Sequence, residues 1–404
     1  MLLSIITVLL SSVLLRHCLQ NDRDMTKIQL DLALDIYRDR FPDSVEPAFF
    51  SPFAITSALS TFYERTTGDS ENQLNNLLAK GESKEKLLHY VRMANRRFEE
   101  NADKVEIGIG SQHLMNDYLA FEENTDGRTH DNDVRNTISI DYSSDQQLDE
   151  IRKHIGEWIK NRTEHRTRNV IFFNDSSLLF SVFEIHCGLK WLYKFKLLRM
   201  KSVFRISDKK VEKVRMMKTV AKKLAYAETE EAKIIALPFE SEKKFMLIII
   251  PRKGNLSNLE SKLTGNKLHQ YIKTLSITNA IEVTMPMFEI RNVIELGPYL
   301  KDRNIALCDQ NSDYYDNDNE QLCLQNPVRA VAHIKVNEHG IYNPEWPMTP
   351  NKDENVNASR NSRKIVIEQS FIFAIGDFRP TIYFMGRYTG KDISLPITYN
   401  KADN

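Results

Sequence analysis

The sequence predicts a single α+β domain in which mostly helical segments come first and large antiparallel sheets follow. Helical periodicity dominates the first half, and from about residue 180 onward the apolar segments are β-branched and aromatic runs bounded by turn residues. The two kinds of segment do not alternate, as they would in a parallel βαβ fold. No Gly/Ser-rich linker divides the 404 residues, of which 41% are hydrophobic, so we expect one large core.

Helices are predicted by apolar residues that recur on one face, in residues 25–37, 70–78, 83–100 and 148–163. The second segment, SENQLNNLL, opens with Ser70 and Gln73 at the spacing of a capping box, which predicts its first turn. The residues expected to share a buried face are, in the third segment, Leu87, Val91, Ala94 and Phe98 and, in the fourth, Leu148, Ile151, Ile155 and Trp158.

Strands are predicted by runs of β-branched and aromatic residues in the second half of the chain. The four clearest are KFMLIIIPR at 244–252, AIEVTMPMFEI at 280–290, KIVIEQSFIFAIGD at 364–377 and TIYFMGRY at 381–388. Since no helical pattern separates most of these runs, we expect antiparallel pairing in large sheets.

Residues 1–20 are predicted to be a secretory signal peptide. The apolar run from Leu2 to Leu15 is shorter than the roughly 20 residues of a bilayer span but typical of a signal-peptide core. No basic residue precedes this run, and Arg16 and His17 follow it directly. Four N-glycosylation sequons agree with export, at Asn161, Asn174, Asn255 and Asn357. We therefore expect a secreted, extracellular glycoprotein without a membrane span.

The sequence contains no HExxH, GxSxG, GxGxxG or P-loop motif, so we expect neither an enzyme nor a bound cofactor or metal. Oxygen-bearing residues from Asp309 to Glu320 have the spacing of a calcium loop, but Tyr314 stands where such a loop needs Gly, which favours a solvated acidic loop. Cys308 and Cys323 bracket this loop and would be able to pair in an oxidising compartment.

A basic stretch lies between residues 190 and 223, where thirteen Lys or Arg residues are accompanied only by Asp208 and Glu212. One interpretation is a site for sulfated polysaccharide or another polyanion, and the other is a solvated sheet edge protected by lysines. Because the net charge of the chain is zero, nucleic acid is not an expected partner. The candidate polyanion-binding residues are Lys209, Lys210, Lys213, Lys222 and Lys223, with a smaller basic set at Arg92, Arg96 and Arg97.

A long polar segment, VNEHGIYNPEWPMTPNKDENVNASRNSRK, separates two predicted strands near the C-terminus. Loops longer than about 12–15 residues are uncommon in compact domains and are often binding loops. This one carries prolines at an interval of three, which favours an extended, solvated polyproline-like conformation.

Several segments, in order, resemble the serpins, a superfamily of serine protease inhibitors. They are AFFSPFAITSALSTFYERTTGDSENQLNNLL, Trp191 with Phe195, VEKVRMM, IIALPFESEKKFMLIIIPRKG, VTMPMFEIRNVIELGPYLKDRNI, HIKVNEHG and SFIFAIGDFRPTIYFMGRYTG. The resemblance runs from about residue 26 to 390. It implies a monomeric serpin domain at 21–404 with about eight or nine helices on three antiparallel-rich sheets and an exposed reactive-centre loop at about 341–366.

The resemblance also gives the loop a function. In serpins this loop is bait for a protease, and after cleavage its first part inserts as a new central strand of the large sheet. By this likeness the hinge comprises Glu338, Gly340, Ile341, Tyr342, Pro344 and Pro347. The scissile bond would fall between about 354 and 363, where a trypsin-like protease would choose Arg360 or Arg363. The partner implied is an extracellular serine protease or a protein of a proteolytic cascade such as clotting or complement.

This chain departs from the family pattern where insertion requires small residues. Proline has no N–H to donate to a central strand, and strand alternation places Asn343, Glu345 and Pro347 on the same face as Ile341. The polar cluster beneath the loop is also altered: Ser51 keeps its place, but Pro47, Ala54 and Ala330 replace polar residues of the family. A glycan at Asn357 would lie in the bait region. The breach above this cluster is expected at Trp191.

We therefore predict a serpin-like protein that engages its partner through the loop without covalent suicide inhibition. Two alternatives stay open from the sequence: a working suicide inhibitor cleaved near Arg360 or Arg363, and a carrier or polyanion-binding protein that uses the basic stretch.

Overall fold

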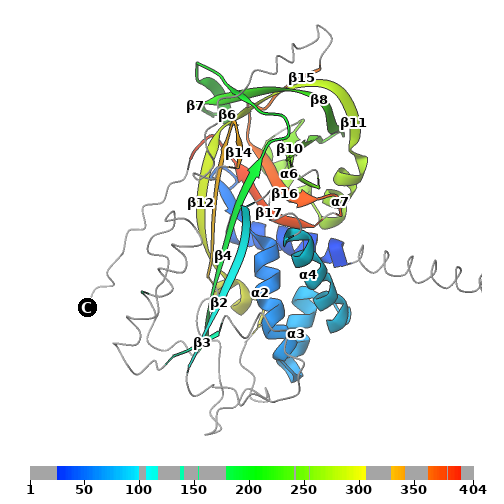
Figure 1. Ribbon diagram of the computed structural model, residues 1–404, viewed down its shortest axis with the longest axis vertical. Coiled ribbons are helices and arrows are strands. Elements are labelled where there is room, and N and C mark those ends of the chain that lie inside the picture. The colour runs from blue at the N-terminus through cyan, green and yellow to red at the C-terminus, as the bar shows by residue number, and fades with distance from the viewer. Residues whose placement is uncertain are drawn as a thin grey trace, which may run out of the picture.

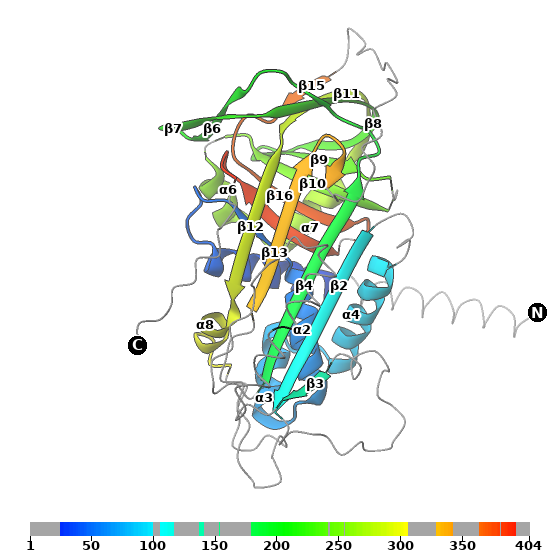
Figure 2. The ribbon, with the colours of Figure 1, turned by 60° about the vertical axis from the view of Figure 1, so that its left-hand side comes forward.

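The computed structural model describes residues 25–99, 106–116, 137–140, 153, 179–240, 243–253, 255–305, 329–341, 363–379 and 381–392. In this part of the chain the predicted α+β class is confirmed. Helices gather behind the lower half of a long, nearly vertical sheet, and a second sheet crosses its upper end (Figures 1 and 2). The described strands form three sheets, as expected.

The N-terminal helices follow the predicted periodicity. A first helix covers residues 25–40, followed by α2 (Pro52–Arg65), α3 (Gly68–Leu78) and α4 (Lys84–Glu99). In α4 the predicted face is confirmed for Leu87, Val91 and Ala94, which are buried. The side chain of Phe98 lies outside the described residues, as does the predicted helix at 148–163 except for residue 153.

The predicted capping box of α3 is wrong. The helix begins two residues earlier, at Gly68, with Thr67 as the N-cap residue, so Ser70 lies buried within the first turn. Thr67 makes no capping hydrogen bond through its side chain. Instead, Asp69 and Glu71 place carboxylates in the first turn, where negative charge stabilises the helix dipole.

A six-stranded sheet forms the long face of the molecule, in the order β12-β13-β14-β4-β2-β3. Its central strands β4 and β13 run parallel to each other and pair from Val182 to Ile185 and from Arg329 to Ala332. The sequence did not predict β2 and β3 in the first half, because Gly108 and Gly110 interrupt the apolar alternation of β2. The bounds are β2 (Glu106–Asn116), β3 (Thr137–Ile140), β4 (Leu179–Lys190), β12 (Phe288–Glu295), β13 (Arg329–Asn337) and β14 (Gly340–Ile341).

A nine-stranded sheet packs behind and across the top of the first, in the order β1-β17-β16-β10-β9-β8-β11-β15, with β5 on β8. A separate hairpin pairs β6 with β7. The bounds are β1 (Ala48–Phe50), β5 (Lys196–Leu197), β6 (Ser202–Ser207), β7 (Lys210–Val214), β8 (Met216–Glu228), β9 (Ala232–Pro238), β10 (Lys244–Pro251), β11 (Ser276–Pro286), β15 (Arg363–Val366), β16 (Phe371–Asp377) and β17 (Ile382–Tyr388).

Two of the predicted strands are each divided in two. The run at 280–290 supplies the end of β11 and the start of β12, which belong to different sheets, and the run at 364–377 supplies β15 and β16. Between β11 and β12 the N–H of Met287 donates to the carbonyl oxygen of Arg215 (2.9 Å), so the chain turns between the sheets without losing this hydrogen bond.

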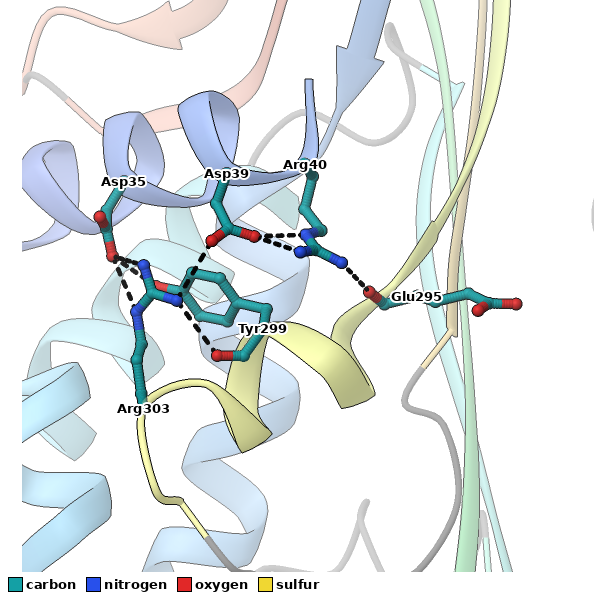
Figure 3. A network of polar contacts seen from close by, with 6 residues as sticks. All are labelled: Asp35, Asp39, Arg40, Glu295, Tyr299 and Arg303. Atoms are coloured by element: carbon teal, nitrogen blue, oxygen red, sulfur yellow. Dashed lines mark hydrogen bonds and ion pairs between the residues drawn. The ribbon is translucent and has the colours of Figure 1, made fainter. Parts of the chain in front are cut away.

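Three short helices connect the strands: α6 (Leu256–Lys262), α7 (Gly265–Thr274) and α8 (Leu296–Lys301). The first helix is braced against α8 by a polar network (Figure 3). Arg303 pairs with Asp35 (2.9 Å) and Asp39 (3.4 Å), and its guanidinium lies over the ring of Tyr299, whose hydroxyl also donates to Asp35 (2.8 Å). The far end of β12 is thereby held to the N-terminal helix.

A buried arginine ties the last strand to the N-terminal segment. The side chain of Arg387 is 2% exposed and pairs with Glu260 of α6 at 3.0 Å. It also donates to the carbonyl oxygens of Glu46 (2.7 Å), Phe41 (3.0 Å) and Asp43, and to the Tyr37 hydroxyl (3.2 Å). Burial opposes the charge of Arg387, but Tyr37 and Glu260 outweigh it and raise the pKa of the guanidinium.

Candidate functional site

The predicted hinge begins as a two-residue strand inside the six-stranded sheet. Strand β14 lies between the upper ends of β4 and β13, where Ile341 pairs with Val336 on one side and Leu189 on the other (Figure 1). Ile341 is 2% exposed and packs into the apolar core. The residue after the hinge Gly therefore points inward.

Gly340 is required by the close approach of two backbones. Its φ of +149° is a conformation that side chains other than glycine rarely adopt. A Cβ at this position would lie 1.9 Å from the Leu189 carbonyl oxygen and 2.9 Å from the Lys190 Cα. Any side chain here would push β14 away from β4.

The turn that leads into the hinge is fastened to the segment after β4. The Asn337 side-chain oxygen accepts the N–H groups of His339 (2.9 Å) and Gly340 (3.3 Å), which closes an Asx-type turn. The indole N–H of Trp191 donates to the Asn337 carbonyl oxygen (2.9 Å), and the Trp191 backbone N–H donates to that of His339 (3.0 Å). The Phe195 N–H donates to the Glu338 carbonyl oxygen (3.1 Å).

Trp191 is itself fixed by aromatic packing. Its ring stacks on Phe239 at 4.7 Å between centroids with an interplanar angle of 12°, and Phe195 packs at 5.6 Å. The structure thus places the predicted residue Trp191 against the turn that contains Glu338. Sequence reasoning missed Asn337 and Phe239, although an Asn at the start of a Gly-containing turn is a recognisable signal for the first.

Below the hinge, the register between β4 and β13 leaves a short unpaired stretch. The two strands pair at 182–185 with 329–332, and β14 pairs with both near their upper ends. Within the described residues, 186–188 of β4 and 333–335 of β13 are not paired with each other. This stretch lies directly along the path that residues after Ile341 would take on insertion.

The polar cluster predicted beneath the loop is buried at all four of its positions, Pro47, Ser51, Ala54 and Ala330. Ser51 precedes α2 and acts as its N-cap: its hydroxyl oxygen accepts the Ala54 N–H (3.0 Å) while its O–H donates to the Tyr383 carbonyl oxygen (2.6 Å). Ala54 and Ala330 present only methyl groups to the core. Of these positions, only Ser51 carries a hydroxyl, and that hydroxyl is already bonded to α2 and β17.

At the far end of the loop, residues 363–366 form β15, which pairs in parallel with β11. Arg363 is opposite Ile281, and its exposed guanidinium lies 5.1 Å from the centre of the Tyr226 ring. At the two ends of the predicted loop at 341–366, Ile341 and residues 363–366 are thus strand, and residues 342–362 lie outside the described residues. Tyr342, Pro344, Pro347 and Arg360 lie outside the described residues.

The predicted polyanion-binding lysines are exposed but divided between two sheets. Lys209, Lys210 and Lys213 lie on the β6–β7 hairpin, and Lys222 and Lys223 lie in β8. The second basic set is different: Arg92 and Arg96 are exposed, whereas Arg97 is not a free surface charge.

Arg97 is half-buried against the end of β16. It lies 3.4 Å from the carboxylate of Asp377 and donates to the Thr381 hydroxyl (2.9 Å). Burial raises the pKa of Asp377, and the Arg97 charge opposes that rise. The expectation that Arg97 belongs to a basic surface is therefore wrong, because a carboxylate 280 residues further along the chain neutralises it.

Asn255 is the one predicted glycosylation site within the described residues. It is exposed and caps α6, its side-chain oxygen accepting the Asn258 N–H (3.0 Å). The other predicted features fall outside the described residues: the signal peptide at 1–20, the sequons at Asn161, Asn174 and Asn357, the loop from Asp309 to Glu320, and Cys308 and Cys323.

In the part of the chain that the structure describes, no group of three or more His, Cys, Asp or Glu residues is placed to hold a metal ion. Among the same residues, no helix combines the length and apolarity that a bilayer crossing requires.

The fold is an α+β domain in which two parallel strands of one sheet, β4 and β13, hold the short strand β14 between their upper ends. Residues 27–390 match the family model described as Serpin (serine protease inhibitor). The chain belongs to the serpin family.

Relatives of this chain are distant in sequence. An uncharacterized serpin-like protein of Methanosarcina acetivorans is 24% identical over 376 residues, covering 86% of this chain and 84% of the relative. Human Serpin B8 is 24% identical over 365 residues, covering 86% and 94%. Among solved structures, human thyroxine-binding globulin in complex with thyroxine superposes with a TM-score of 0.76 at 18% identity, covering 92% of this chain and all of the other.

Proposed function

We propose that this protein is a secreted serpin that engages a serine protease through residues 342–362 without trapping it covalently. Family membership supports the protease as partner. The observation that carries the second half of the proposal is the inward position of Ile341, because it sets the register in which the rest of the loop would have to enter the sheet.

The register can be continued residue by residue. Ile341 pairs with Val336 in β13 and Leu189 in β4, and both pairings are antiparallel. Each step forward along the loop is therefore one step back along both strands. Residues 342–344 would enter the stretch where β4 and β13 are not paired, and Glu345 would arrive between Ala332 and Ile185, the first pair that insertion must separate.

Insertion beyond this point is opposed by the residues that it would bury. Glu345 would lie on the same inward face as Ile341, and a buried unpaired polar group costs about 1–3 kcal/mol, with a charge costing more. Pro344 and Pro347 would each fail to donate a backbone hydrogen bond in a central strand. Together these costs are comparable to the roughly 5–15 kcal/mol that stabilise a whole domain.

The proposal is tested with trypsin at limiting and at excess concentration, with the products analysed on a denaturing gel and by melting temperature. We expect cleavage in the loop, no complex that survives denaturation, and no rise in melting temperature. The triple substitution Pro344→Ala, Glu345→Ala and Pro347→Ala should produce a rise in melting temperature after cleavage. The control Pro350→Ala, beyond the inserting part, should not. A denaturation-resistant complex with the natural chain would refute the proposal.

The second candidate function is a working suicide inhibitor. Two observations favour it: Gly340 and Ile341 already occupy the sheet, and the next three residues could enter without breaking a β4–β13 pair. Arg360→Ala and Arg363→Ala test it, because loss of the trypsin complex in one variant alone would identify the scissile bond. Since Arg363 is held in β15, we expect Arg360 to be the preferred site.

We also propose that the chain is glycosylated outside the cell. Asn255 is exposed at the start of α6, where a glycan on the side-chain nitrogen is compatible with capping by the side-chain oxygen. A shift in mobility after treatment with a peptide N-glycosidase, reduced by Asn255→Gln, tests this.

A polyanion-binding function rests only on the exposure of Lys209, Lys210, Lys213, Lys222 and Lys223, and retention on heparin at physiological salt tests it.

A further inference from the structure

A cavity of about 320 Å³ lies where the β6–β7 hairpin meets the upper ends of β12 and β13. Both views show the hairpin lying across the top of β12 (Figures 1 and 2). The volume of the cavity is at the lower end of the range of roughly 300–1,000 Å³ that is typical of small-molecule binding sites. The cavity borders the hinge, because one of its lining residues, Val336, pairs with Ile341. None of the described hinge residues, Glu338, Gly340 and Ile341, lines it.

The floor of the cavity is made of packed aromatic rings. Phe288 and Tyr388 are each 2% exposed and stack with ring centroids 4.9 Å apart and an interplanar angle of 23°. Phe204 and Phe371 pack against Tyr388 from behind, at 5.3 Å and 5.9 Å. Burial raises the pKa of Tyr388, as do the nearby carboxylates of Asp392 and Glu212. Within the described residues no hydrogen bond of the Tyr388 hydroxyl is found, so its O–H is available as a donor.

The rim of the cavity is predominantly cationic, with Lys201, Lys213, Arg215 and Lys335 all exposed. Two acids, Glu289 and Asp392, also line the cavity. Glu289 pairs with Lys335 (3.1 Å) and His333 (3.0 Å), and Asp392 accepts the backbone N–H of Glu289 (3.0 Å). Burial raises the pKa of Asp392, and the charges of Lys335 and Lys201 oppose that rise. Among the described residues, Lys213 and Arg215 make no ion pair, which leaves two cations at the mouth of the pocket.

We propose that this pocket binds a small amphipathic organic anion, in which one carboxylate or sulfonate is attached to a flat apolar ring system. The ring system would cover the floor formed by Phe288 and Tyr388, and the anionic group would meet Arg215 and Lys213 at the rim. Hydrogen bonds between charged groups are stronger than those between neutral groups. Inorganic phosphate would use the cations but leave the floor exposed. A neutral aromatic compound would use the floor but leave the cations without an anion.

The test compares two dyes that share a ring system and differ in charge. The anion is 8-anilinonaphthalene-1-sulfonate, and N-phenyl-1-naphthylamine is the same scaffold without the sulfonate. Fluorescence titration of the full chain should show one saturable site for the anion. Arg215→Gln and Lys213→Gln should each weaken anion binding roughly tenfold, equivalent to about 1.4 kcal/mol, with little effect on the neutral dye. Tyr388→Phe should weaken it severalfold.

Matched controls locate the site. Lys222→Gln and Lys223→Gln remove equally exposed cations outside the cavity and should leave both dyes unaffected. Met287→Trp fills the cavity from its half-buried wall and should abolish binding of both. The proposal is overturned if the control lysines matter as much as Arg215, if Met287→Trp binds normally, or if inorganic sulfate displaces the dye as readily as naphthalene-1-sulfonate does.

Discussion

Replacing Arg387 by methionine should lower the free energy of unfolding more than replacing any exposed charged residue of the protein does. The change removes five hydrogen bonds while keeping most of the apolar stem, and leaves the Glu260 carboxylate buried with Tyr37 as its remaining donor. Removing one partner of a buried ion pair costs about 3–5 kcal/mol. Phe41 and Asp43, whose carbonyl oxygens also lose a donor, are not buried residues.

Urea unfolding followed by circular dichroism measures this loss as a shift of the midpoint at unchanged slope. Arg252→Met is the matched control, because Arg252 is exposed and its pair with Glu228 at 3.8 Å should contribute no more than about 1 kcal/mol. Glu260→Gln, alone and combined with Arg387→Met, closes a double-mutant cycle. A loss no larger than that of the control, or strictly additive losses in the cycle, would refute this account of the buried pair.

Three further changes test the hinge and the edge of the sheet. Gly340→Ala should speed proteolysis near residue 341, since its Cβ would clash with the Leu189 carbonyl; unchanged cleavage would contradict this. Trp191→Phe should lower the unfolding free energy by about 1 kcal/mol through loss of the bond to Asn337, and no shift in urea midpoint would count against it. Burial alone would raise the pKa of Glu289, but Lys335 and His333 outweigh it and lower the pKa. The stability that this carboxylate contributes is therefore present above the pKa of Glu289 in the unfolded chain, and it is lost as the pH falls through the pKa in the folded chain. On acidification below about pH 5, the natural chain should therefore lose more stability than the Glu289→Gln variant.

Local patterns were predictable where a single element decides them. The buried face of α4 follows from the spacing of Leu87, Val91 and Ala94, and the strands of the second half follow from their β-branched runs. Strand β2 was missed because two glycines break its alternation, although β4 supplies its partners. The start of α3 was misplaced because a capping box at Ser70 competes with carboxylates in an earlier first turn.

The site was predictable in its residues but not in its contacts. The hinge Gly and Trp191 could be named from the likeness to a family. The inward position of Ile341 depends instead on its pairing with two strands: β4, which ends about 150 residues earlier, and β13, which ends only a few residues earlier. The pairing of Arg97 with Asp377 and the cavity beside Tyr388 join segments from distant parts of the chain. No local spacing carries such information, because it arises only when the sheets assemble.

The contacts of Arg387 also constrain the order in which the protein can be made. Strand β1 pairs with β17, with Ala48 opposite Arg387, so the first strand of the sheet waits for a partner about 340 residues further along the chain. At roughly 5–20 residues per second, synthesis leaves this N-terminal segment without that partner for about 20–70 seconds. During that interval Phe49 and Phe50, both buried in the finished protein, have no strand to cover them. The nascent chain should therefore depend on chaperones until its last strand emerges.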